Sequence, residues 1–453
     1  MSAVYYILGV VVFVAAILAS IGLHELGHMV PAKAFGGKVT QYFIGFGPTV
    51  WSRQRGETEY GLKAIPLGGY VKIVGMLPPT VDGVADEITF DSEGNKVVKV
   101  RKSNTGMFTQ LISDARAAEW EHVKPGDADR LFYKMAWWKK VIVMAGGPTV
   151  NLLIAFFLFW TVFGTYGART IEPNPGPPVI ETVSECLLPY AEEGRACRAD
   201  DPPTPAVEAG LLPGDVITSF NGVEVTGWEQ FRGLIRNNAG GEAVIGFERD
   251  GEPMTGTTNT TVQARPTSNT DLTLTQVGFL GVTSVSHVVV THGGPLYTLE
   301  QMGTMTKDTV AALVNLPVKV WGVAKAIVGL EDRAADSPIS IVGGGRIAGE
   351  TVSHEDYIAS EKMVFLLMLV AGFNLFIGLF NFIPLLPLDG GHIAGALYEA
   401  IRRGVAKLNG RPDPGYVDVA KLLPIAYGVA VVMLVMGVVL IVGDLVVPLH
   451  LES

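Results

Sequence analysis

The residues best suited to chemistry stand at the end of the first apolar segment, in the run His24-Glu25-Leu26-Gly27-His28. On a helix, side chains four residues apart lie on one face, so both imidazoles can bind one Zn²⁺ ion. Glu25 lies beside them, placed to take a proton from an attacking water. The alternative is a pair of surface histidines on a soluble helix. It is disfavoured because these three residues interrupt a segment that otherwise avoids charge, and polar groups at membrane depth are usually functional.

Two histidines leave a catalytic zinc ion short of a protein ligand. Asp389 is the best third candidate, because it follows an apolar run in which two prolines break the helix and free the backbone. His392 is the runner-up, although a polar residue at the cytoplasmic interface explains it more simply. Glu57 and Glu59 are also possible, but both fall in a predicted strand with ordinary surface charge.

The composition places these residues in a membrane protein. Of 453 residues, 48% are hydrophobic and only 17% are charged, and the net charge is −10. Soluble domains carry about 25% charged residues, and a negative chain lacks the basic face that nucleic acid requires. Four windows are free of charge and long enough to cross ~30 Å of hydrocarbon. They are Val4–Leu23, Val141–Ala168, Met363–Leu388 and Leu422–Gly443.

The charges between these windows predict the orientation. Residues 31–140 hold 16 basic and 12 acidic side chains, residues 390–421 hold 5 and 3, and residues 168–360 hold 12 and 24. Because basic loops stay in the cytoplasm, we expect the first two segments inside. Both termini and the acidic segment are then expected outside. An oxidising compartment there permits a disulfide between Cys186 and Cys197, and two free thiols are the alternative.

The acidic segment also has the pattern of a small β domain with one helix. An Asn221-Gly222 turn joins two short strand patterns, which is a good hairpin signal, and residues 227–236 form an amphipathic helix pattern. This block resembles a PDZ domain of the bacterial protease type. Such a domain adds a peptide as an extra strand; a steric cover over the membrane part is the other interpretation. Residues 31–77 predict β-hairpins, and residues 78–129 a polar insertion with a turn at Asp91–Asn95.

Together these motifs resemble the bacterial site-2 proteases with a single PDZ domain, which are intramembrane zinc metalloproteases. The resemblance rests on the HExxH run, the PDZ block and four further motifs. These are Gly45-Phe-Gly-Pro48 with Pro66-Leu-Gly-Gly-Tyr70, Ala145-Gly-Gly-Pro-Thr-Val-Asn151, Pro338-Ile-Ser-Ile-Val342 and Asn381 to Gly391. The resemblance implies that His24, His28 and Asp389 bind Zn²⁺ and that Glu25 is the catalytic base. It also implies that Asn381, Gly68, Gly69 and Tyr70 bind substrate. The insertions at 78–129 and 184–203 depart from the family.

We therefore expect a polytopic α-helical membrane protein with four transmembrane helices, membrane-associated β-hairpins and an inserted extracytoplasmic PDZ domain. The expected parts are 1–30, 31–77, 78–140, 141–168, 169–270 (PDZ domain with linker), 271–360 (interfacial helices), 361–392, 393–421 (cytoplasmic loop) and 422–448. The expected activity is hydrolysis of bonds in transmembrane segments of pre-trimmed single-span proteins, such as anti-sigma factors or signal-peptide remnants, in the bacterial cell membrane. A non-catalytic PDZ scaffold and a zinc membrane protease of another substrate class are the alternatives.

Overall fold

A computed structural model describes residues 2–78, 87–90, 96–99, 107–120, 123, 125–190, 195–266 and 274–449. The chain divides into two compact units, one made of residues 1–166 and 293–453 and the other of residues 167–292. Each unit is treated by itself below. The turn expected at Asp91–Asn95, much of the 78–129 insertion and part of the 184–203 insertion lie outside the described residues.

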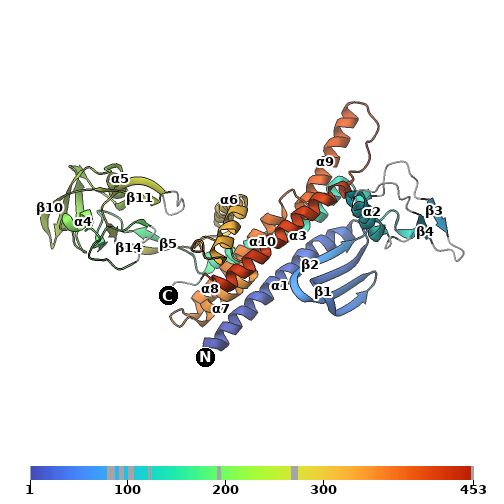
Figure 1. Cartoon of the computed structure of the whole chain (residues 1–453), viewed down its shortest axis with the longest axis horizontal. Coiled ribbons are helices and arrows are strands. Elements are labelled where there is room, and N and C mark those ends of the chain that lie inside the picture. The colour runs from blue at the N-terminus through green and yellow to red at the C-terminus, as the bar shows by residue number, and fades with distance from the viewer. Residues whose placement is uncertain are drawn as a thin grey trace. The chain divides into compact units, whose positions relative to one another are not determined.

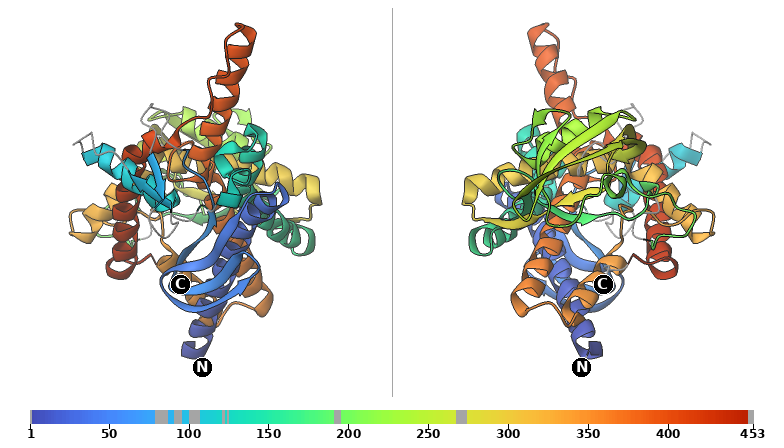
Figure 2. Two further views of the ribbon diagram at one scale, coloured as in Figure 1. Left: turned by 90° about the vertical axis from the view of Figure 1, so that its right-hand side faces the viewer. Right: turned by 90° about the vertical axis from the view of Figure 1, so that its left-hand side faces the viewer.

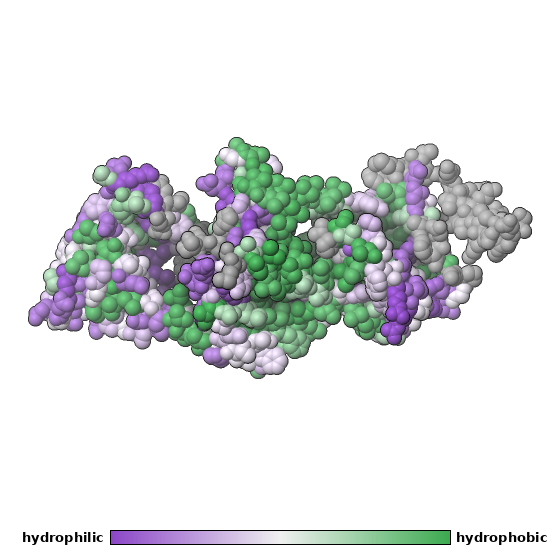
Figure 3. Space-filling model, turned by 90° about the horizontal axis from the view of Figure 1, so that it is seen from below, coloured by the Kyte–Doolittle hydropathy of each residue, from purple (hydrophilic) through white to green (hydrophobic). Residues whose placement is uncertain are grey.

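The first unit is built mainly from long apolar helices (Figure 1). Its α-helices are α1 Ser2–Ala34, α2 Met107–Trp120, α3 Trp137–Thr165, α6 Pro295–Ile327, α7 Ile341–Ser353, α8 Ala359–Asn381, α9 Asp389–Leu408 and α10 Leu423–Val446. Short 3₁₀ turns lie at Pro125–Asp127, Phe132–Lys134 and Val419–Leu422. The surface over the long helices is mainly green in Figure 3, whereas the surface of the second unit mixes purple with green. This apolar surface fits a lipid environment.

Among the described residues, five helices are long and apolar enough to cross a membrane, one more than the four spans that the sequence predicted. The additional one is α6, where we expected a helix on the membrane surface. Five charged residues lie within α6, so it contains no charge-free window long enough to be counted as a span. The segment 393–421, expected as a loop, is largely occupied by α9.

Contacts between side chains fix the relative directions of three of these helices. Along α1, Phe13 stacks edge-on with Phe373, and further on Ser20 accepts a hydrogen bond from Asn374. Still further along α1, His24 faces Asp389, just beyond the end of α8. The contacts advance together, so α1 and α8 run in the same direction. In contrast α3 runs opposite to α1, because Gly146 touches Gly27 and the later residue Leu158 packs in the cluster around Phe13.

A long curled hairpin follows α1 and packs against it. Strands β1 Val39–Arg55 and β2 Thr58–Ile73 are antiparallel, and Figure 2 shows their blue ribbon curving beside α1. The last stretch of β2 pairs with residues 39–44 along one edge. No strand among the described residues pairs with its other edge. A small separate hairpin joins β3 Glu87–Phe90 to β4 Lys96–Lys99.

The second unit is a small β domain around one apolar core. Its strands are β5 Ala168–Pro173, β6 Ile180–Val183, β7 Val216–Phe220, β8 Val223–Glu224, β9 Glu242–Arg249, β10 Glu252–Asn259, β11 Thr261–Pro266, β12 Leu274–Phe279, β13 Val282–Ser284 and β14 Ser286–Thr291. Its helices are α4 Pro205–Glu208 and α5 Trp228–Asn237, and α5 buries Phe231 and Ile235 in the core. A disulfide joins Cys186 to Cys197. The unit extends past residue 270, because β14 returns to pair with β5.

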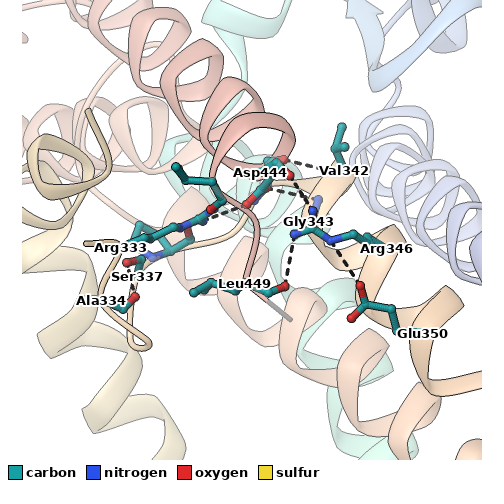
Figure 4. Close-up of polar contacts among 12 residues, drawn as sticks. Arg333, Ala334, Ser337, Val342, Gly343, Arg346, Glu350, Asp444 and Leu449 are labelled. Carbon is teal, nitrogen blue, oxygen red and sulfur yellow. Dashed lines mark hydrogen bonds and ion pairs between the residues drawn. The ribbon is translucent and has the colours of Figure 1, made fainter. Parts of the chain in front are cut away.

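A buried ion pair fastens the end of α10 to the start of α7 (Figure 4). The Asp444 carboxylate accepts hydrogen bonds from the Arg333 guanidinium at 2.8 Å and from the Ser340 backbone N–H at 2.7 Å and hydroxyl at 2.6 Å. It also accepts one from the N–H of Gly343 in the first turn of α7, where the helix dipole favours an anion. Arg346 in turn donates to the backbone carbonyl of Asp444. Buried charges are tolerated when paired in this way, so α10 has a fixed attachment to α7.

Candidate metal centre and substrate cavity

The structure brings together three potential metal ligands from two distant parts of the chain. The Nε2 atoms of His24 and His28 lie 3.2 Å apart, and the Oδ2 atom of Asp389 lies 3.4 Å from the first and 3.3 Å from the second. One ligand atom from each residue falls within 4.8 Å of the others. Two imidazole nitrogens and one carboxylate oxygen form the donor set typical of a catalytic zinc site that keeps its fourth position open.

The surroundings of His28 fit a metal ligand. Its Nδ1 atom lies 2.8 Å from the backbone carbonyl oxygen of Val143 on α3. A carbonyl oxygen only accepts, so Nδ1 carries the proton and the lone pair of Nε2 is left for a cation. Metal-binding histidines are usually oriented by such a second hydrogen bond. The residues present therefore fit a zinc ion.

A cavity of 410 Å³ opens beside these ligands. Glu25, which is 9% exposed, lines it together with Val71 of β2. The substrate-binding candidates predicted from the resemblance also line it: Gly68, Gly69 and Tyr70 from β2, and Asn381 from the end of α8. The arrangement offers a general base, a cation site and an unpaired strand edge around one space.

Breaks in helical structure and one ion pair position Asp389. Helix α8 ends at Asn381, residues 382–388 with two prolines are not α-helical, and α9 begins at Asp389 itself. This irregular segment therefore places the Asp389 carboxylate beside the two histidines. Deeper along α9, Glu399 accepts a hydrogen bond from the buried Lys140 of α3 at 2.8 Å. This pair holds α9 against the helix that also orients His28.

The other ligand candidates do not join the group. His392 lines the cavity but, among the described residues, is not part of the cluster of ligand atoms. Glu57 instead forms a two-pronged ion pair with Arg130, at 2.7 and 2.8 Å. The hydrogen bonds from that guanidinium lower the pKa of the Glu57 carboxyl, so it stays charged and committed to Arg130. Glu59 is likewise outside the cluster.

Gly147 on α3 is a site residue that spacing alone could not identify. A Cβ atom at this position would overlap the Nε2 atoms of both His24 and His28. The absence of a side chain therefore makes room for the ligands. Its sequence signal was only the glycine pair in the 145–151 motif, which says nothing about what packs there.

We expect Gly147→Ala to displace both imidazoles and to remove bound zinc together with peptide hydrolysis. Zinc content per purified chain, measured by inductively coupled plasma mass spectrometry, checks the prediction. The matched control is Gly372→Ala on α8, where an added Cβ would meet no atom within 4 Å. Full zinc occupancy in Gly147→Ala would contradict the geometry.

The model of peptidase family M50 matches residues 12–420. The zinc metalloprotease Rip1 of Mycobacterium tuberculosis is 33% identical over 454 residues, which cover 98% of this chain and 99% of Rip1. The regulator of sigma-W protease RasP of Bacillus subtilis is 24% identical over 95% of this chain and 96% of its own length. The metalloprotease MmpA of Caulobacter vibrioides is 25% identical over 86% of both chains.

Proposed function

The chain belongs to peptidase family M50, and from this premise we propose that it is an intramembrane zinc metalloendopeptidase. It hydrolyses a peptide bond inside a transmembrane segment of a single-span membrane protein. The observation that carries this proposal is the cluster of His24, His28 and Asp389. The two histidines and Glu25 lie on α1, a helix long and apolar enough to cross a membrane. A polar cluster of this kind at membrane depth needs a functional reason.

The chemistry follows from the residues that line the cavity. Zinc held by His24, His28 and Asp389 would supply a Lewis acid that polarises the scissile carbonyl. Glu25 takes the proton of the attacking water and then delivers it to the leaving amine, which balances the hydrolysis. Asn381, which lines the same cavity, binds the substrate backbone.

The unpaired edge of β2 captures the substrate. A transmembrane helix hides its carbonyls in its own hydrogen bonds, so the target must unwind before water can attack. Residues 68–71 line the cavity, and this part of β2 is paired along only one edge. An unwound segment can therefore add to this edge as a further strand, with main-chain hydrogen bonds supplying affinity.

We further propose that the active site lies near the cytoplasmic leaflet, with both termini and the second unit outside. Support comes from the basic loops and from the directions of the helices. Because α1 and α8 run the same way and α3 runs the opposite way, the chain between α3 and α8 must begin and end on one side. A single crossing by α6 would break this pattern. We therefore assign the crossings to α1, α3, α8 and α10 and place α6 at the outer surface.

The second unit acts as a PDZ-type filter for substrates that another protease has already trimmed outside. Its β-rich architecture with α5 against β12 supports this interpretation. The proposed partners are anti-sigma factors and signal-peptide remnants embedded in the bilayer. The name of the Bacillus subtilis relative, regulator of sigma-W protease RasP, supports the first class for this chain.

The proposal is tested in bacterial cells whose own copy of the gene encodes Glu25→Gln. Quantitative mass spectrometry of the membrane fraction should find trimmed single-span fragments that accumulate relative to cells with the unmodified gene. Fragments at equal abundance in both strains would overturn the proposed function. A scaffold without catalysis predicts that equal abundance, since Glu25→Gln leaves the second unit unchanged.

A further inference from the structure

Asn151 is a buried amide in the cavity that the mechanism above does not use. It lies on α3, one helical turn after Gly147, so it shares the helix face that meets the histidines. Asn151 lines the same cavity as Glu25 and Asp389, and it is only 2% exposed. The Oδ1 atom has no hydrogen-bond partner among the described residues. A buried polar atom left unpaired is costly, so its place in a cavity points to a ligand that pairs with it.

A second buried asparagine shows what a structural role looks like in this unit. Asn374 on α8 donates from Nδ2 to the carbonyl oxygen of Val370 at 2.8 Å and to the hydroxyl of Ser20 at 3.1 Å. These bonds join α8 to α1. The Oδ1 atom of Asn374 also has no partner among the described residues, but Asn374, unlike Asn151, does not line the cavity. Asn151 makes no comparable link between helices among the described residues, and it faces the space that the substrate must enter.

The missing partner can be identified by its chemistry. Oδ1 is an acceptor, so its partner must be an N–H or O–H donor, and the substrate backbone supplies N–H groups. When a transmembrane helix unwinds, its backbone N–H groups lose their internal acceptors in a region with little water, and each must be satisfied again. The β2 edge can satisfy those on one side of the extended segment, whereas N–H groups that point away from it need another acceptor.

We propose that Asn151 contacts the substrate, and that its Oδ1 atom accepts a hydrogen bond from a backbone N–H group of the unwound segment. This inference rests on the proposed function, since it names how the same cavity holds its substrate. It assigns to α3 a direct part in substrate binding, in addition to its part in positioning His28. The contact lowers the cost of unwinding at the place where the bond is cut.

The first test compares two isosteric substitutions in the purified full-length chain. Asn151→Leu should lower kcat/KM about 10-fold, the loss of one hydrogen bond, while zinc content and Tm are retained, because an unpaired acceptor is removed. Asn374→Leu should do the reverse, with a lower Tm and kcat/KM within about 3-fold. An Asn151→Leu variant with unchanged kcat/KM would overturn the inference.

The second test locates the contact in the substrate. The probe is a synthetic single-span peptide of about 30 residues, in which one backbone N–H at a time is replaced by an ester oxygen. At one position the ester should lower kcat/KM about 10-fold for the unmodified enzyme and not at all for Asn151→Leu. Equal ester effects at every position in both enzymes would overturn the inference.

The failure of the inference can be told apart from the failure of the proposed function. Cleavage of the all-amide peptide by the unmodified enzyme tests the function itself. If the peptide is not cleaved, the function fails. The amide contact is then tested by the Kd of the peptide for Glu25→Gln. The inference requires that Kd to rise about 10-fold when Asn151→Leu is added, and an unchanged Kd contradicts it.

Discussion

Replacing Glu25 with glutamine is expected to lower kcat by about 10³-fold while zinc remains bound. Glutamine has nearly the same shape as glutamate but cannot take a proton from water. Glu25 is not one of the three clustered ligands, so its replacement leaves the cation site intact. Single-turnover cleavage of a single-span peptide in detergent, with zinc content measured on the same samples, checks both parts of the prediction.

The control for this experiment is Glu57→Gln, which alters a carboxylate committed to Arg130 outside the cavity. It should leave both kcat and zinc content unchanged. If Glu25→Gln lost zinc and activity together, Glu25 would be a ligand rather than the base. If it retained full activity, another group would have to activate the water.

Replacing Asp389 with alanine is expected to weaken zinc binding by more than about 100-fold. Replacing a residue that only orients a metal ligand already lowers metal affinity about 10- to 100-fold. Asp389 is placed to be a ligand itself, so its loss should cost more. Without it, two imidazoles alone remain of the clustered donors. Competition with a chromogenic zinc chelator measures the affinity, and kcat should fall in parallel with occupancy.

His392→Ala is the matched comparison, because His392 lies in the same cavity and was the runner-up ligand from the sequence. His392→Ala should retain one zinc ion per chain in competition with the chelator. Under the same conditions Asp389→Ala should lose its zinc to the chelator. The opposite result, with zinc retained in Asp389→Ala and lost in His392→Ala, would exchange the roles of the two residues.

The sequence predicted the parts of the site that have strict local chemistry. The HExxH run requires a helix to place its imidazoles together, and the apolar segment around it supplies that helix. Asp389 was predicted because the two prolines ended one helix and left a carboxylate at the end of an apolar run. The structure places these residues within one cluster. Proline, charge and helical periodicity are local signals, and they were sufficient to predict the residues of this cluster.

Features that depend on packing between distant segments were not predictable. Nothing in the sequence indicates that Gly147 lies against two histidines, or that the Oδ1 atom of Asn151 has no partner in the described part of the chain. The β5–β14 pairing that extends the second unit joins strands more than 100 residues apart. Helix α6 was not among the predicted spans for a different reason, since its scattered charges hide a long apolar helix from a search for charge-free windows.

The ion pair of Lys140 and Glu399 shows the limit of charge patterning in the same way. Both residues were counted only toward the net charge of loops, and both are buried against each other in the structure. A count of charges predicts which side of the membrane a loop occupies. It does not predict which charges leave the surface to hold two helices together.

The most direct test of the central claim is the position of the cut in a purified system. A single-span peptide reconstituted in lipid vesicles with the zinc-loaded enzyme is digested in H₂¹⁸O, and the products are sequenced by mass spectrometry. The account predicts new termini inside the apolar segment, one ¹⁸O in each new carboxyl group, and no products with Glu25→Gln. Termini confined to the residues outside the bilayer, or the same products from Glu25→Gln, would contradict it.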